Sequence, residues 1–135
     1  MSLLRWSNKF SVGVKAMDNQ HITLVSILNE LHAAMMKGEA QSVADRLLKK
    51  LMEYAGNHFS AEEKLMASVQ FPGLAAHREQ HRQLTIKAEK IVARYQQGDN
   101  TIFTPLLYFL RDWLTTHMQQ EDKEYTAWLN AHGVC

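Results

Sequence analysis

Apolar residues recur at steps of three and four along most of the chain, which is the period of an α-helix. In the first such segment the apolar positions are Ile22, Val25, Leu28, Leu31 and Met35. Asp18 can cap the start of this segment and Gly38 can end it. The pattern therefore predicts a first helix over about 18–37.

The same period returns in three later segments. They predict helices over about 41–68, 74–97 and 105–120, with a helical tail to about residue 131. The stretch QFPG reads as a turn, and Thr104 and Pro105 resemble a cap and a first-turn proline for the last helix. Short loops make sequential helices antiparallel neighbours. The prediction is an all-α, up-down-up-down four-helix bundle.

The N-terminal segment lacks this period. Residues 1–17 carry Trp6, Phe10, Val12 and Val14, and we expect an extended arm that packs onto the bundle. With no repeat or linker in the pattern, residues 1–135 are predicted to form a single domain.

Composition narrows the class of protein. The net charge is +1, from 15 basic and 14 acidic side chains, so there is no electrostatic signature of a nucleic-acid or membrane-surface partner. Cys135 is the only cysteine, which excludes an intrachain disulfide. No segment resembles a signal peptide or a membrane span, and we expect a cytoplasmic protein.

Five of the seven histidines have the placement of metal ligands. They are His21, His58, His77, His81 and His117. His77 and His81, like His58 and Glu62, are four residues apart and share one helix face. In an antiparallel bundle all five histidines fall at the same level along the axis. Coincidence explains a single histidine easily, but it does not explain this set.

The donor types restrict the metal without fixing it. A structural zinc site usually includes thiolates, and calcium and magnesium prefer oxygen ligands. Mixed imidazole and carboxylate donors suit iron, and two carboxylates can bridge two ions. Manganese, copper and a dinuclear zinc centre remain open on these grounds.

Four motifs, in order and spacing, resemble those of the hemerythrin family. They are DNQH at 18–21, HFSAEEKLM at 58–66, HREQH at 77–81 and WLTTHMQQEDKEY at 113–125. The resemblance covers essentially the whole chain and is closest to the single-domain bacteriohemerythrins. It implies a four-helix bundle with a non-haem di-iron centre that binds O₂ reversibly.

The resemblance also implies a role for each ligand. His77, His81 and His117 would hold one iron, and His21 and His58 would hold the other, which keeps an open position. Glu62 and Asp122 would bridge the two irons together with a hydroxide or oxide. O₂ would bind at the open iron and take one electron from each ion.

Two details of this assignment are specific to the chain. Asp122 lies five residues after His117, about 140° around a regular helix, and Glu121 would be better placed, so we expect a π-type bulge near 118–122. The O₂ pocket is expected to be lined by Leu24, Phe59, Trp113, Leu114 and Met118. Met118 stands where the family commonly has isoleucine.

Other polar residues receive ordinary interpretations. Glu63 is read as a solvated surface residue, and His32 and His132 as surface or core residues that bind no metal. The leading hypothesis is a protein that carries, stores or delivers O₂ and is not an enzyme, as a monomer or weak oligomer. The alternatives are an O₂ or redox sensor with a signalling partner, and a di-iron oxidase or peroxidase. Delivery would involve an O₂-consuming enzyme as partner.

Overall fold

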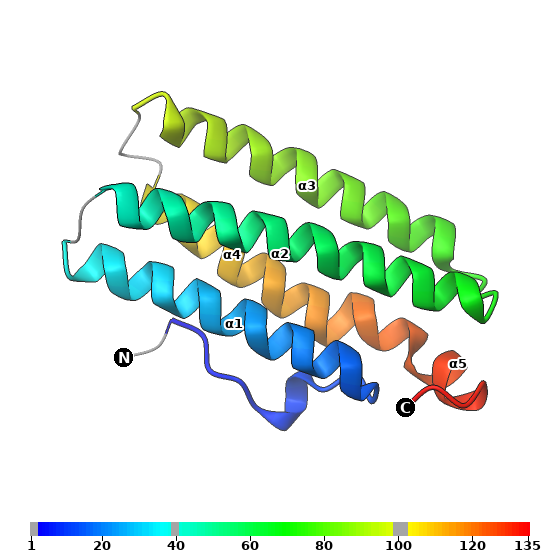
Figure 1. The fold of residues 1–135 in the computed structure, drawn as a ribbon. Helices are drawn as coiled ribbons and strands as arrows, with labels where there is room; N and C mark the ends of the chain where they lie inside the picture. Colours follow the sequence, from blue (N-terminus) through cyan, green and yellow to red (C-terminus); the bar gives the residue numbers. More distant parts are fainter. Residues whose placement is uncertain (1–2, 39–40, 99–102) are drawn as a thin grey trace.

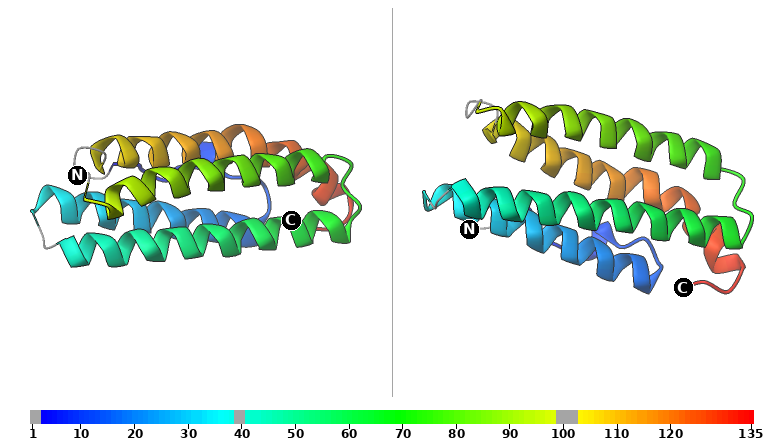
Figure 2. Two further views of the ribbon diagram at one scale, coloured as in Figure 1. Left: turned by 90° about the horizontal axis from the view of Figure 1, so that it is seen from above. Right: turned by 45° about the horizontal axis from the view of Figure 1, so that its top comes forward.

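The computed structural model describes residues 3–38, 41–98 and 103–135, and it forms a bundle of four main helices (Figure 1). These are α1 (Lys15–Met36), α2 (Gln41–Ser68), α3 (Leu74–Gln96) and α4 (Phe103–Thr116). The helices alternate in direction along the bundle (Figures 1 and 2). The predicted all-α, up-down four-helix fold is confirmed.

The start of α1 differs from the sequence prediction. The helix begins at Lys15, so the arm ends at Val14 and Asp18 lies inside the first turn. The Asp18 carboxylate accepts hydrogen bonds from the Ser11 hydroxyl at 2.6 Å and from the Val12 N–H at 2.8 Å. The prediction that Asp18 caps the helix was wrong, because its carboxylate instead ties the arm to the helix.

Two other helix ends were also predicted. Gly38 follows α1 with φ +65°, and its N–H donates to the Met35 carbonyl, as expected of a glycine that ends a helix. The predicted cap of the fourth helix was wrong. Because α4 begins at Phe103, Thr104 lies within the helix and does not cap it, while Pro105 is still in the first turn.

The C-terminal continuation of α4 is irregular. It passes into a π-helix, η3 (His117–Glu121), then a 3₁₀ turn, η4 (Asp122–Tyr125), and the short helix α5 (Thr126–Ala131). The predicted distortion near 118–122 is confirmed for the backbone. The wider π turn changes the direction of every residue after His117 relative to a continuous α-helix.

The N-terminal arm packs along the bundle beside α1 (Figures 1 and 2). It contains one 3₁₀ turn, η1 (Asn8–Phe10). Leu4 exchanges two backbone hydrogen bonds with the side chain of Asn29, at 3.0 and 2.7 Å. Near the other end of the arm, the Thr126 hydroxyl donates to the Val12 carbonyl, which joins the arm to α5.

Buried apolar residues form two clusters. The larger cluster comprises Phe10, Leu24, Val25, Ile27, Leu28, Leu31, Ala34, Ala44, Leu47, Leu48, Leu51, Ala55, Tyr95, Leu106, Leu107, Leu110, Leu114 and Met118. The smaller cluster comprises Val12, Val14, Met17, Met66, Tyr125 and Leu129. The two clusters occupy successive levels of the bundle, and the functional candidates fall at the boundary between them.

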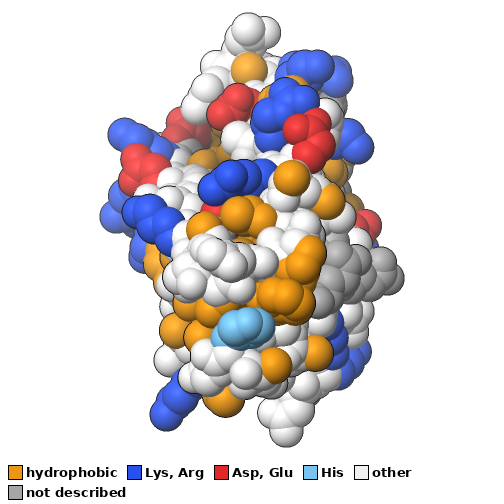
Figure 3. Space-filling model, turned by 90° about the vertical axis from the view of Figure 1, so that its right-hand side faces the viewer, with side chains coloured by type: hydrophobic (Ala, Val, Ile, Leu, Met, Phe, Trp, Pro, Cys, Tyr) orange, Lys and Arg blue, Asp and Glu red, His pale blue; other side chains and the backbone are white. Residues whose placement is uncertain are grey.

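The end of the bundle that carries α5 has a mixed surface. Basic and acidic side chains are interspersed toward α3, and hydrophobic side chains gather lower on the same face (Figure 3). Among the described residues, no helix is both long enough and apolar enough to cross a membrane.

Candidate metal centre

A layer of buried polar side chains separates the two apolar clusters. This polar layer consists of His21, His58, Glu62, His77, His81 and His117, each at most 3% exposed. The helical period supplies it, because one residue or pair per helix replaces an apolar residue at the same level of the bundle. Each of the four main helices, or its direct continuation, therefore contributes to one site.

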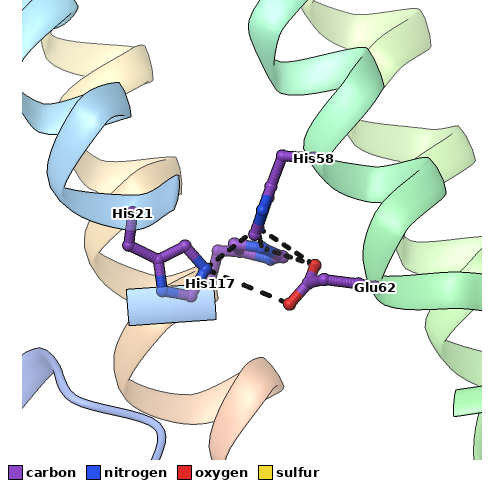
Figure 4. A group of neighbouring side chains, drawn as sticks. All are labelled: His21, His58, Glu62 and His117. Atoms are coloured by element: carbon purple, nitrogen blue, oxygen red, sulfur yellow. Dashed lines mark hydrogen bonds and ion pairs between the residues drawn. The ribbon is translucent and has the colours of Figure 1, made fainter. Parts of the chain in front are cut away.

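Glu62 lies at the centre of the layer, and Figure 4 shows the imidazoles of His21, His58 and His117 gathered beside its carboxylate. Its Oε1 atom is 3.2 Å from the Nε2 atoms of His58 and His117, and 3.3 Å from that of His81. The Nε2 atom of His77 lies 3.9 Å from Oε1, and that of His21 lies 4.0 Å from Oε2. One carboxylate is therefore within 4 Å of five imidazoles.

The donor atoms fall into two overlapping groups. In each, the ligand atoms lie within 4.8 Å of one another. The first contains His21, His58, Glu62 and His117, and the second contains Glu62, His77, His81 and His117. Because Glu62 belongs to both groups, the layer offers two adjacent metal positions with a shared carboxylate.

Burial sets the protonation states that metal ligands require. The pKa of His58 is lowered from 6.5, chiefly by loss of solvation and against the opposing charge of Glu62. For Glu62, loss of solvation alone would raise the pKa, but the neighbouring His117 and His58 hold it well below 4.5. A neutral imidazole and an ionised carboxylate are the forms that bind cations.

Hydrogen bonds from outside the layer orient two of the histidines. The Nδ1–H of His58 donates to Gln20 Oε1 at 2.7 Å, and the Nδ1–H of His81 donates to Glu63 Oε2 at 3.0 Å. Neither acceptor oxygen carries a hydrogen, so the hydrogen of each imidazole lies on Nδ1 and the lone pair remains on Nε2. The Nε2 atoms of both rings face Glu62, so both rings present a lone pair to the site.

A third outer contact holds the shared carboxylate. The hydroxyl of Tyr125, which is fully buried, donates to Glu62 Oε2 at 2.7 Å. Tyr125 lies just beyond the π-helix, at the end of η4. The backbone irregularity that follows His117 thus ends at the residue that fixes Glu62.

None of these three outer partners was predicted from the sequence. Glu63 was read as a solvated residue, and this was wrong: it is half-buried, bonded to His81, and also accepts from Arg78 Nε at 3.2 Å. Gln20 and Glu63 each stand next to a layer residue in sequence, about 100° around the helix, so they face the adjacent helix. That offset from His21 and Glu62 is the signal that could have identified them.

The residues expected to line an O₂ pocket lie around the layer. Leu24, Leu114 and Met118 are buried in the larger cluster. The Phe59 ring stacks on His81 with centroids 4.0 Å apart, and the Trp113 ring stacks on His117 at 5.8 Å. All five are close to the candidate centre in the fold, on the side of the larger cluster.

Two acidic residues and two further histidines were also considered from the sequence. The side chains of Asp122 and Glu121 lie outside the described residues, although their backbone belongs to η4 and η3. His32 is half-buried on α1, and His132 is exposed with its Nδ1–H donating to the Trp128 carbonyl at 2.7 Å. Neither of these histidines belongs to the polar layer.

Comparisons with known proteins agree with this geometry. Residues 12–129 match the family model of the hemerythrin HHE cation binding domain. The chain is 30% identical over 132 residues to a bacteriohemerythrin of Stenotrophomonas maltophilia, covering 98% of this chain and 85% of the relative. It is 29% identical to a bacteriohemerythrin of Methylococcus capsulatus, covering 97% and 100%. A crystal structure of wild-type hemerythrin superimposes with a TM-score of 0.87 at 29% identity, covering 95% of this chain and 98% of that one.

Proposed function

The chain belongs to the hemerythrin family of cation-binding proteins, and on this premise we propose that it binds O₂ reversibly at a non-haem di-iron centre. The main support is the position of Glu62, which lies within 4 Å of the Nε2 atoms of five histidines. A carboxylate with two oxygens in such a position suits two ions that share it.

The ligands divide unequally between the two positions. In the proposal, His77, His81 and His117 hold one iron, and His21 and His58 hold the other. Glu62 would be shared between the two ions, and Asp122 would supply a second shared carboxylate. The two-histidine side would have one ligand fewer, which would leave room for O₂ there.

An iron pair bound at these residues would supply the electrons with which O₂ is held and then released unchanged. The protein supplies orientation and a dry environment. Tyr125 fixes one oxygen of Glu62, while Gln20 and Glu63 hold the imidazoles of His58 and His81 in the ligand tautomer. Leu24, Leu114 and Met118 exclude water from the adjacent space, which disfavours proton-assisted loss of the ligand.

Binding, rather than turnover, is proposed because the polar layer, among the described residues, consists of candidate ligands and is flanked by residues that orient them. A protein acid or base is not needed for a ligand that leaves unchanged. The relatives named above are likewise called bacteriohemerythrins.

The test is an optical titration of the iron-loaded, anaerobically reduced protein. Exposure to air should produce a visible absorption band, and argon should remove it over repeated cycles. The control is Glu79→Gln. Glu79 is an exposed residue of α3 outside the polar layer, so this variant should behave like the wild type. The proposal is wrong if the protein takes up no iron, or if air converts the iron-loaded protein irreversibly and in one step to an oxidised form.

A further inference from the structure

A groove of about 780 Å³ lies between α2 and α3, with α4 beneath it. Its walls come from α2 between Asp45 and Phe59 and from α3 between Leu84 and Gln96. Leu110 and Trp113 of α4 form part of the floor. The two wall helices run side by side in opposite directions (Figures 1 and 2). The groove therefore follows the bundle axis.

The groove is long and narrow. From Asp45 to Phe59, α2 rises about 21 Å at 1.5 Å per residue. The residues along its base are apolar, and they include Leu48, Leu51, Met52, Ala88 and Leu110. A ligand that fills this space must bring an extended apolar body.

Charge is unevenly distributed along the groove. At the end where α2 begins, Arg46 and Lys49 outnumber Asp45. Glu53 and Glu89 lie near the middle. The opposite end, at Phe59 and Trp113, has an uncharged lining. An anionic head group is therefore accommodated at the Arg46 end and an apolar tail at the other.

The inner end of the groove touches the polar layer. Phe59 and Trp113 are perpendicular to each other with centroids 5.5 Å apart. Phe59 stacks on His81 and Trp113 on His117, so these two rings separate the groove from two candidate metal ligands. A molecule that fills the inner end would contact both rings.

We propose that this groove binds one single-chain fatty acid, with the alkyl chain along the apolar floor and the carboxylate beside Arg46 and Lys49. The volume is within the range of small-molecule sites, about 300–1,000 Å³. O₂ alone needs only a small part of it. The site is independent of the proposed O₂ function.

Dodecanoate is a suitable probe, used below its critical micelle concentration with the 135-residue chain as purified. Calorimetry should give one equivalent bound, and the fluorescence of the protein should change because Trp113 lies at the inner end. The blocking variant is Gly56→Leu. Gly56 lines the groove, no neighbouring atom lies within 4 Å of the position of an added Cβ, and leucine favours the helix more than glycine does.

The control for this variant is Asn57→Leu, an equally large apolar addition at the next exposed position of α2, outside the groove lining. Affinity for dodecanoate should fall at least about tenfold in Gly56→Leu and remain unchanged in Asn57→Leu. Absence of binding to the wild type overturns the proposal. So does equal binding by Gly56→Leu, because the chain would then lie elsewhere.

A second comparison tests the position of the carboxylate. Reversal of the outer cations by Arg46→Glu with Lys49→Glu should weaken dodecanoate about tenfold and leave dodecanol unaffected. Equal weakening of both probes, or of neither, contradicts the assigned head-group position and with it the fatty-acid class of ligand.

Discussion

The larger apolar cluster and the polar layer are equally buried and lie one helical turn apart, yet they make opposite contributions. Leu24 and His21 are neighbours on α1, and neither side chain is exposed at all. Burial of the leucine stabilises the fold by removing apolar surface from water. Burial of the histidine removes polar atoms from water, which costs free energy unless they are bonded. The cluster therefore supports the fold, and the layer is maintained for binding.

The backbone shows the same contrast. Leu110 of the larger cluster lies within the regular α4 helix, whereas His117 of the layer opens a π-helix followed by a 3₁₀ turn. Irregular turns of this kind cost helical hydrogen bonding and are frequent at functional sites. The molecule is regular where it only needs to be stable, and irregular where side chains must converge.

The strongest test of this contrast is Leu28→Ala in the larger cluster. Leu28 is 1% exposed, so the substitution leaves a cavity and should lower the free energy of unfolding by about 2–5 kcal/mol. Denaturant unfolding of the metal-free protein measures this. Metal bound per folded molecule should not change. Ile22→Ala on the exposed part of the same helix is the control and should shift stability by no more than about 0.5 kcal/mol.

Glu62→Gln should have the opposite profile. The substitution keeps the shape of the side chain but removes the charge shared by the five histidines, so metal affinity should fall by more than the roughly hundredfold seen for lost outer partners. The metal-free protein should also lose some stability, because the ionised Glu62, with its pKa held well below 4.5, contributes to the fold at neutral pH. Metal analysis with chelator competition, alongside unfolding, separates the two effects. Full metal occupancy in this variant would contradict the central role of Glu62.

Outside the layer, Glu63→Gln tests how an outer partner affects the histidine that it orients, His81. Glutamine still accepts from His81 Nδ1, so the tautomer is preserved, but the negative charge behind the imidazole is lost. Metal affinity should fall by about tenfold, the lower end of the range for outer partners. Competition with a chelator of known affinity measures it.

The reverse substitution provides the control. Gln20→Glu places a carboxylate behind His58, where an amide stands now, and should strengthen rather than weaken metal binding. Equal losses in both variants would show that Gln20 and Glu63 act only by packing.

The sequence predicted the bundle and the level of the five histidines because both depend on periodicity. Positions such as His77 and His81, four apart, share a face wherever the helix is regular. The expected bulge after His117 combined this arithmetic with the family resemblance, which implies a ligand at Asp122, five residues on and therefore past one face of a regular helix. The helical period was therefore informative even after His117, where the backbone departs from a regular α-helix.

Contacts between helices could not be predicted in this way. Gln20 and Glu63 project toward an adjacent helix, and their partners depend on how the helices are rotated against each other. Asp18 illustrates the same limit: its residue type suits a helix cap, but the arm folds back and its carboxylate accepts from Ser11 and Val12 instead. At Asp18, tertiary contacts outweighed the local preference of an aspartate for a helix cap.

Acid should weaken the layer before it affects the larger cluster. The folded-state pKa of His58 lies below 6.5, so the unfolded chain binds more protons just below pH 6.5, and stability falls as the pH falls through that range. Glu62, whose pKa is held well below 4.5, loses its contribution only in stronger acid. The unfolding midpoint of the metal-free protein should therefore drop between about pH 7.5 and about pH 5.5. In His58→Gln this drop should be smaller.

The smallest effect is expected at Glu79, which lies between His77 and His81 but faces outward. Its carboxylate accepts two hydrogen bonds from Arg82, at 2.9 and 2.6 Å, and these lower its pKa to about 2. The pair is nevertheless exposed, and solvent screens its attraction. Glu79→Gln should leave the unfolding midpoint, metal affinity and O₂ response unchanged, whereas Glu62→Gln, on a buried carboxylate, should remove metal binding. A clear loss of metal in Glu79→Gln would mean that charge outside the layer sets its affinity, and burial would no longer explain the difference between the two glutamates.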